Sequence, residues 1–164
     1  MYEIDCARFR LTYWCPLVIS RLSSIDIEAT EGAALLLAGL SILTAMRLGP
    51  VEGVLGGTLI LLSLVAHELG HLMAAQLRGV RVKAIGLCLK GAYIRRTDSQ
   101  IAMTELVIAS AGPLANLLLF LLLRSKYPVL SWVAELNLIL AISNLLPIRG
   151  LDGHRILTSL RQLI

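Results

Sequence analysis

The sequence predicts a mainly α-helical, polytopic membrane protein of about four transmembrane helices, with a small β-hairpin between the second and the third. The chain of 164 residues is 57% hydrophobic and 16% charged, whereas about a quarter of the residues of a soluble domain are charged. Its mean hydropathy is +0.78. The apolar residues are gathered in long segments, as in membrane-spanning helices. Because the sequence contains no long linker and no internal repeat, we expect a single domain over residues 1–164.

The first part of the chain, residues 1–31, is expected to be an interfacial N-terminal segment. Its apolar stretch 11–20 is interrupted by Pro16 and is too short to cross a bilayer, so it predicts an interfacial strand or short helix. The stretch also lacks the small-residue cleavage site of a signal peptide. Residues 24–31 are acidic, and we interpret them as a polar approach to the first span.

Four apolar segments predict the membrane spans, at residues 32–48, 54–77, 101–123 and 129–147. The first is followed by Gly49 and Pro50, and Pro147 ends the last, since both residue types are poorly tolerated inside helices. Between the second and third spans, short apolar runs flank a turn at residues 90–91 and predict the β-hairpin. Residues 148–164 are expected to form a cytoplasmic tail with amphipathic character.

Basic residues are concentrated on one side of the predicted spans. The loop between the second and third spans carries Arg78, Arg81, Lys83, Lys90, Arg95 and Arg96. The positive-inside rule therefore places this loop in the cytoplasm. We expect a multi-pass protein of a prokaryotic cell membrane, with the lipid bilayer as a partner. The net charge of +4 does not indicate nucleic acid, because no basic stripe is interleaved with aromatic residues.

The second span contains the pattern His-Glu-x-x-His, formed by His67, Glu68 and His71. On a helix the two histidines lie one turn apart on the same face, so both imidazoles can reach one small cation. Glu68 flanks that face and can reach a water bound to the cation, as the general base of zinc peptidases does. The alternative is a chance match in which the histidines are buried hydrogen-bonding groups. A metal site near the cytoplasmic face is favoured, because ionisable residues inside a membrane are costly and mostly functional.

A catalytic zinc site needs a third protein ligand beside two histidines. The candidates are Asp98, Glu105, Glu135, Asp152 and His154. Glu105 opens the third span on the correct side of the membrane, whereas Glu135 lies toward the opposite face. Asp152 follows Pro147 and Gly150, which interrupt the helix of the fourth span, and a carboxylate at a broken helix end can point inward to a metal. We favour Asp152 on this ground, with an ordinary Asp-Gly turn as the alternative.

Three motifs in this order carry a resemblance to a known family. They are His-Glu-Leu-Gly-His at residues 67–71, Ala-Gly-Pro-Leu-Ala-Asn at 111–116, and Asn-Leu-Leu-Pro at 144–147 followed by Leu-Asp-Gly at 151–153. The chain resembles the site-2 protease family of intramembrane zinc metalloproteases. The resemblance implies one Zn²⁺ per chain, held by His67, His71 and Asp152, with Glu68 activating water. It also implies that Asn144 stabilises the oxyanion or positions the substrate.

The function implied by the resemblance is that of a zinc-dependent endopeptidase. Its substrate would be a single-span membrane protein, cut at a peptide bond within or near the transmembrane segment. The predicted hairpin would hold this substrate extended or, alternatively, would lie on lipid through Arg95 and Arg96. A catalytically silent, chaperone-like membrane partner of the same fold is the alternative function, and a structural or transport protein with incidental histidines is a further one. No residue expected for catalysis is missing.

Some polar residues near the motifs have no assigned catalytic role. Asn116 serves either helix packing or catalysis, and Asn137 is interpreted as a packing amide. Family members often carry two prolines where Arg149 and Gly150 stand, and a glycine where His154 stands. These departures remove no catalytic atom, but they change the polarity and flexibility of the turn before Asp152. The sequence does not indicate an oligomeric state.

Overall fold

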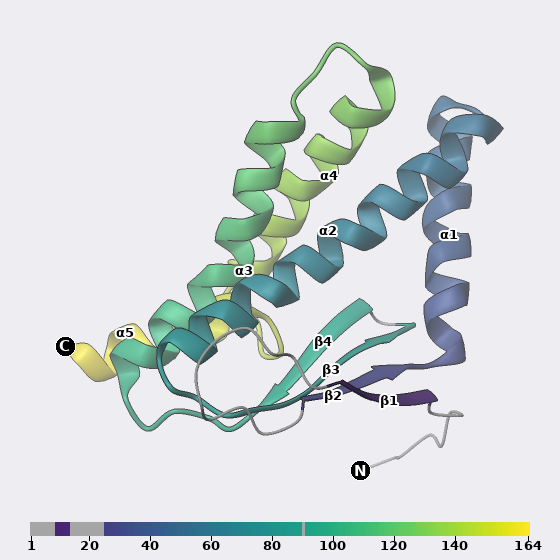
Figure 1. Ribbon diagram of the computed structural model, residues 1–164. Coiled ribbons are helices and arrows are strands. Elements are labelled where there is room, and N and C mark those ends of the chain that lie inside the picture. The colour runs from purple at the N-terminus through teal and green to yellow at the C-terminus, as the bar shows by residue number, and fades with distance from the viewer. Residues whose placement is uncertain (1–8, 14–24, 90) are drawn as a thin grey trace.

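The structure of the protein is a computed structural model that describes residues 9–13, 25–89 and 91–164 (Figure 1). Its elements, in chain order, are β1 (Phe9–Tyr13), β2 (Ile25–Ala29), α1 (Glu31–Leu48), α2 (Pro50–Leu77), β3 (Val82–Cys88), β4 (Gly91–Arg96), α3 (Ala102–Leu123), α4 (Pro128–Asn144) and α5 (Asp152–Leu163). The sheet lies across one end of the long helices, and α5 lies at that same end.

The fold is mainly helical, as the sequence predicts. α1, α2 and α3 are long and apolar enough to cross a membrane, and α4 is a shorter apolar helix. α2 begins at Pro50 rather than at residue 54, because proline suits the first position of a helix, where an N–H would have no helical partner. α4 ends at Asn144, short of residue 147, because Pro147 cannot donate a hydrogen bond and disfavours helical backbone in the preceding residue.

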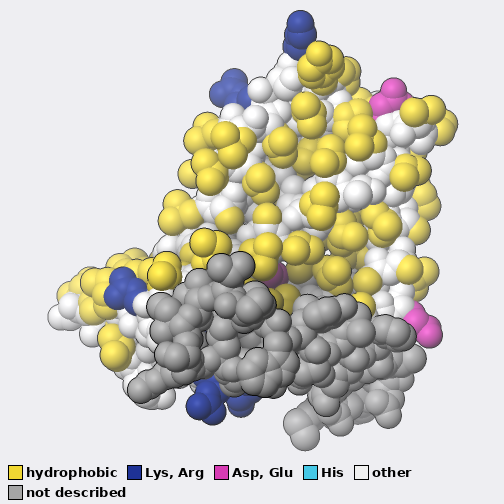
Figure 2. Space-filling view, in the orientation of Figure 1, with side chains coloured by type: hydrophobic (Ala, Val, Ile, Leu, Met, Phe, Trp, Pro, Cys, Tyr) yellow, Lys and Arg dark blue, Asp and Glu magenta, His cyan; other side chains and the backbone are white. Residues whose placement is uncertain are grey.

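The outer surface of the helices is apolar (Figure 2). Hydrophobic side chains cover most of the helical part of the face in view, and charged side chains lie mainly toward its ends. The exposed large side chains of α1 to α4 include Leu35, Met46, Leu62, Leu114, Leu121 and Ile139. Soluble proteins rarely expose contiguous apolar surface of this extent, whereas hydrocarbon chains cover it without cost. The chain is therefore an integral membrane protein.

The four strands form one sheet in the order β1-β2-β3-β4. β3 and β4 are the antiparallel hairpin that the sequence predicts between the second and third long helices. β2 pairs with β3 in parallel, and β1 pairs with β2, two pairings that the sequence does not indicate. Part of the expected polar approach at 24–31 is thus strand β2. β1 covers the beginning of the apolar stretch 11–20, and residues 14–20 lie outside the described part of the chain.

A row of residues across the sheet ties β2 to the hairpin. Glu28, Gly86 and Tyr93 are aligned in the two strand registers. Gly86 leaves room for the Tyr93 ring, whose Cε1 would lie 2.7 Å from a Cβ at this position. The Tyr93 hydroxyl donates to Glu28 Oε2 at 2.7 Å, and Arg95 donates to the other carboxylate oxygen. Burial and the bond to Glu28 raise the pKa of Tyr93 to about 12, so the phenol stays protonated.

α2 is the central helix of the bundle and contacts α1, α3 and α4. It meets α1 at Gly53, Gly56 and Gly57, where any Cβ would collide with α1 atoms. Small residues let membrane helices approach closely in this way. On another side, Ser63 accepts a hydrogen bond of 2.8 Å from Nδ2 of Asn137 in α4. Asn137 is fully buried, in agreement with its predicted role as a packing amide.

The chain reverses direction between α4 and α5. Gly150 has φ of +98°, a backbone conformation that glycine adopts without steric cost. Asp152 therefore opens the separate helix α5, rather than lying at the broken end of the fourth span as expected from the sequence. α5 packs against α3, and this packing carries Asp152 back toward α2.

Candidate active site

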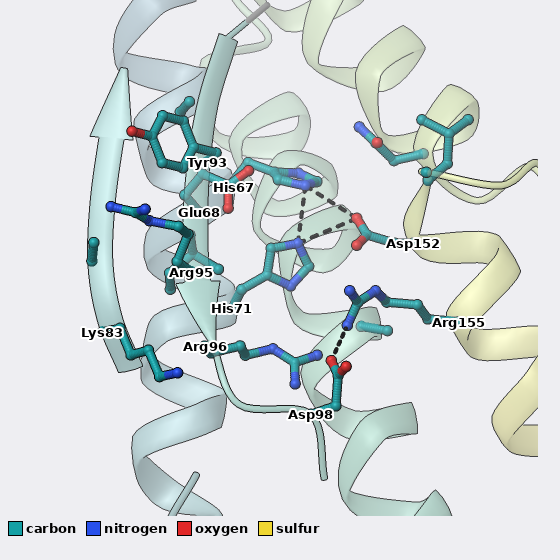
Figure 3. A pocket seen from close by; sticks show the side chains of 17 residues that line it. His67, Glu68, His71, Lys83, Tyr93, Arg95, Arg96, Asp98, Asp152 and Arg155 are labelled. Atoms are coloured by element: carbon teal, nitrogen blue, oxygen red, sulfur yellow. Dashed lines mark hydrogen bonds and ion pairs between the residues drawn. The ribbon is translucent and has the colours of Figure 1, made fainter. Parts of the chain in front are cut away.

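His67 and His71 project from the C-terminal half of α2 toward Asp152 at the start of α5 (Figure 3). Each histidine is only 6% exposed. Their Nε2 atoms lie 3.1 Å apart, and Oδ2 of Asp152 lies 3.2 Å from each of them. Three potential ligand atoms from two helices thus converge on one point.

The separations within this triad fit a zinc ion. Ligand bonds of about 2.0–2.1 Å in tetrahedral geometry require ligand atoms about 3.3 Å apart. Imidazole nitrogen and carboxylate oxygen are also donors that Zn²⁺ accepts in catalytic sites. Burial raises the pKa of Asp152, but the neighbouring His67 and His71 outweigh burial and hold this pKa at about 2. The carboxylate is therefore ionised and can act as an anionic ligand.

The other candidate ligands are not part of the triad. Glu105 accepts two hydrogen bonds from the guanidinium of Arg96, each of 2.7 Å. Asp98 is exposed and pairs with Arg155 at 3.3 Å. Among the described residues, the group able to hold a metal consists of His67, His71 and Asp152. Two further candidates also lie outside it: Glu135 and His154.

A cavity of about 950 Å³ opens beside the triad. Glu68 lines it next to the two histidines, and strand β4 contributes its residues 92–96 to the wall. Asn144, the last residue of α4, also lines the cavity. Its Nδ2 donates to the carbonyl of Leu140 at 3.0 Å, which leaves one N–H of the amide for another acceptor. All five residues predicted for the site from the sequence therefore border one cavity.

The close approach of α3 to α2 positions the imidazoles. Nδ1 of His71 donates to the carbonyl oxygen of Ile108 at 2.7 Å, which directs Nε2 of the same ring toward the triad. Gly112, one turn further along α3, faces both rings. A Cβ at Gly112 would lie 2.6 Å from Cε1 of His71 and 2.7 Å from Nε2 of His67. Glycine is therefore needed here for the histidines to meet.

Comparison with known proteins shows which proteins the chain resembles. Residues 57–127 match the profile of peptidase family M50. A protein of Synechocystis sp., provisionally assigned as a zinc metalloprotease, is 34% identical over 121 residues, which is 67% of this chain and 32% of the relative. A zinc metalloprotease of Methanocaldococcus jannaschii is 34% identical over 112 residues, which is 62% of this chain and 33% of that protein. The chain thus spans about a third of the length of these relatives.

A solved structure extends the likeness over nearly the whole chain. The site-2 protease from Methanocaldococcus jannaschii superposes with a TM-score of 0.68 and 28% sequence identity, over 96% of this chain and 73% of that one. The chain therefore resembles peptidase family M50 over residues 57–127 and shares the fold of a site-2 protease. The match over 57–127 includes the first two motifs. The third motif, which contains Asp152, lies beyond that match. The superposition on the solved site-2 protease, however, covers 96% of this chain.

Two features of this site-2 protease homologue were not predicted from its sequence. The first is the close approach of Gly112 to both histidines, a role that the sequence does not assign to this glycine. The second is the ion pair of Arg96 with Glu105, whose side chains are 7% and 14% exposed. Arg155, one turn after Asp152, lies 3.6 Å from Glu105. This charge cluster joins β4, α3 and α5 beside the metal triad.

Proposed function

We propose that the protein is a zinc-dependent intramembrane endopeptidase that hydrolyses a peptide bond within or near the transmembrane segment of a single-span membrane protein. The observation that carries the proposal is the convergence of His67, His71 and Asp152 to 3.1–3.2 Å, beside Glu68 in a cavity at membrane helix α2. The likeness to peptidase family M50 and to a site-2 protease supports the same chemistry.

The protein residues take distinct parts in this proposal. His67, His71 and Asp152 would hold one Zn²⁺, which supplies Lewis acidity and acidifies water in such sites. Glu68 is placed to accept a proton from the attacking water and to hand it to the leaving amine. The free N–H of the Asn144 amide is available to the carbonyl oxygen as negative charge develops on it.

Strand β4 is suited to hold the substrate. A peptide bond inside a helix is sequestered by its own hydrogen bonds, so a transmembrane substrate has to unwind before it is cut. β4 is an edge strand of the sheet and borders the cavity, so an extended peptide can pair with it. Arg95 and Arg96 are engaged by Glu28 and Glu105, which favours this role over attachment of the hairpin to lipid.

The sidedness of the site follows from the charges. Arg78, Arg81 and Lys83 lie at the end of the molecule where α2 meets the sheet. We infer that this end faces the cytoplasm of a prokaryotic cell and that water reaches Glu68 from there. A cysteine-accessibility assay in sealed vesicles tests this orientation. Labelling of a cysteine placed at Lys83 by an impermeant reagent added outside right-side-out vesicles would contradict it.

The proposed activity is tested with the full chain purified in detergent and loaded with zinc. The substrate is a tagged, designed single-span helix with a central Asn-Gly pair, and cleavage is followed by mass spectrometry. Glu68→Gln should keep the metal and lose cleavage by about 10²–10⁴-fold, because general base catalysis contributes that much. Equal cleavage by both proteins would refute the role of Glu68. Zinc binding with no cleavage by the wild type, across a panel of such helices, would instead favour the silent membrane partner.

A further inference from the structure

The two histidines of the triad differ in the support that their second ring nitrogen receives. Nδ1 of His71 is bonded to the Ile108 carbonyl. Nδ1 of His67 is buried, and it has no hydrogen-bond partner among the residues that the structure describes. Because Nε2 of His67 faces the other ligand atoms, Nδ1 is the nitrogen that carries the proton when Nε2 binds a metal. A buried N–H without an acceptor is costly.

Asn116 of α3 is the complementary case. It is fully buried, and neither its Oδ1 nor its Nδ2 has a partner within the described part of the chain. Burial of an unbonded amide in apolar surroundings is costly. Helix packing alone would be served better by an apolar residue of the same size. The buried amide therefore indicates a hydrogen-bonding role that none of the described residues satisfies in the structure.

Helix geometry places Asn116 on the face of α3 that approaches His67. Gly112 lies against Nε2 of His67, as the 2.7 Å approach of a Cβ shows. Asn116 follows Gly112 by four residues and so lies on the same face of α3, one turn along. Side chains of a helix tilt toward its N-terminus, so the Asn116 amide extends back over the turn of Gly112. That turn is where the ring of His67 lies.

We propose that Asn116 is a positioning residue for the metal site, whose Oδ1 accepts a hydrogen bond from Nδ1–H of His67 through one buried water. The bond fixes the tautomer and the orientation of the ring, as the Ile108 carbonyl does for His71. The inference rests on the metal ligands of the proposed function. It assigns to Asn116 a role beyond helix packing, acting through His67 and not on the substrate.

Cobalt titration of the purified full chain tests the assignment without any substrate. The Co²⁺ dissociation constant is measured from the visible absorption of the bound ion, for the wild type and for Asn116→Leu and Asn116→Asp. Asn116→Leu keeps the volume but removes the acceptor, and it should weaken Co²⁺ binding by about 10–100-fold. Asn116→Asp keeps Oδ1 and replaces the NH₂ group by a second oxygen, so an acceptor for Nδ1–H remains and the affinity should stay within about threefold of the wild type or rise.

Asn137→Leu is the matched control. It removes another fully buried amide, which bonds to Ser63 on α2, and it should lower the unfolding temperature without changing the Co²⁺ affinity. Thermal unfolding of the metal-free proteins separates loss of fold from loss of ring positioning. Should Asn116→Leu fail to fold, Asn116→Ala takes its place in the titration with the same expected loss.

Each outcome decides the matter. Wild-type affinity in Asn116→Leu, or an equal loss in Asn116→Leu and Asn116→Asp, would overturn the role of Asn116 and leave the proposed protease unaffected. A loss in Asn137→Leu as large as that in Asn116→Leu would reduce the effect to packing and would also overturn it. Absence of Co²⁺ binding by the wild type would overturn the metal site itself, and the inference with it.

Discussion

Gly112→Ala provides a direct test of how α3 positions the histidines. The new Cβ would lie 2.6 Å from Cε1 of His71 and 2.7 Å from Nε2 of His67, well inside van der Waals contact. Relief of these contacts requires the rings to move by nearly 1 Å, whereas metal sites tolerate deviations of about 0.2 Å in ligand distances. Overpacking of this kind costs about 1–3 kcal/mol, and here it would destabilise the arrangement of the two rings that binds the metal. This range corresponds to about 5–150-fold weaker zinc binding.

The assay is competition for Zn²⁺ against a chromophoric chelator, with the purified chain in detergent. Gly39→Ala is the matched control, because Gly39 lies in membrane helix α1 with nothing within 4 Å of the position of a new Cβ. Gly39→Ala should bind zinc like the wild type and unfold at the same or a slightly higher temperature. Unchanged zinc affinity in Gly112→Ala would refute the claim that the missing side chain makes room for the ligands.

Three further predictions concern stability. Arg96→Met should lower the free energy of unfolding by about 3 kcal/mol, because a largely buried carboxylate loses two charged hydrogen bonds and keeps the longer contact with Arg155. Asp98→Asn, at an exposed pair, should change it by less than about 1 kcal/mol in the same urea titration. Since the pKa of Tyr93 is about 12 in the folded protein, its stabilising effect is full below pH 10 and is lost as the pH rises toward 12. In Tyr93→Phe the free energy of unfolding should no longer fall over this pH range, and the phenolate absorbance that appears near pH 12 should be absent. An identical pH profile in both proteins would contradict this. Zinc at 100 times its dissociation constant should stabilise the wild type by about 2.7 kcal/mol and Asp152→Ala hardly at all, as measured by thermal unfolding with and without chelator; equal shifts in both would argue against Asp152 as a ligand.

The sequence predicted the elements whose pattern is local. Apolar length is enough to recognise a membrane helix, because the bilayer sets the length that a span requires. The spacing of His67 and His71 placed both rings on one helix face, and the structure brings their Nε2 atoms to 3.1 Å. Helix ends were predicted less accurately. α2 begins at Pro50, whereas hydropathy predicted a start at residue 54.

Features that depend on long-range pairing were missed. The alternation of apolar and acidic residues at 25–29 is a strand signal, but nothing local indicates that this strand pairs in parallel with β3, which follows two long helices. The break at Gly150 was recognised, whereas the start of a separate helix α5 at Asp152 was not. The contact of Gly112 with the histidines depends on how α3 is rotated against α2, which the sequence of either helix leaves open.

The central claim is that His67, His71 and Asp152 together form one zinc site. X-ray absorption at the zinc edge of the loaded chain tests it most directly. The prediction is two imidazole ligands and oxygen ligands, all at about 2.0–2.2 Å, with one imidazole lost in His67→Ala and a changed oxygen shell in Asp152→Ala. A sulfur ligand at about 2.3 Å, such as Cys88 could provide, or a single imidazole in the wild type would contradict the claim.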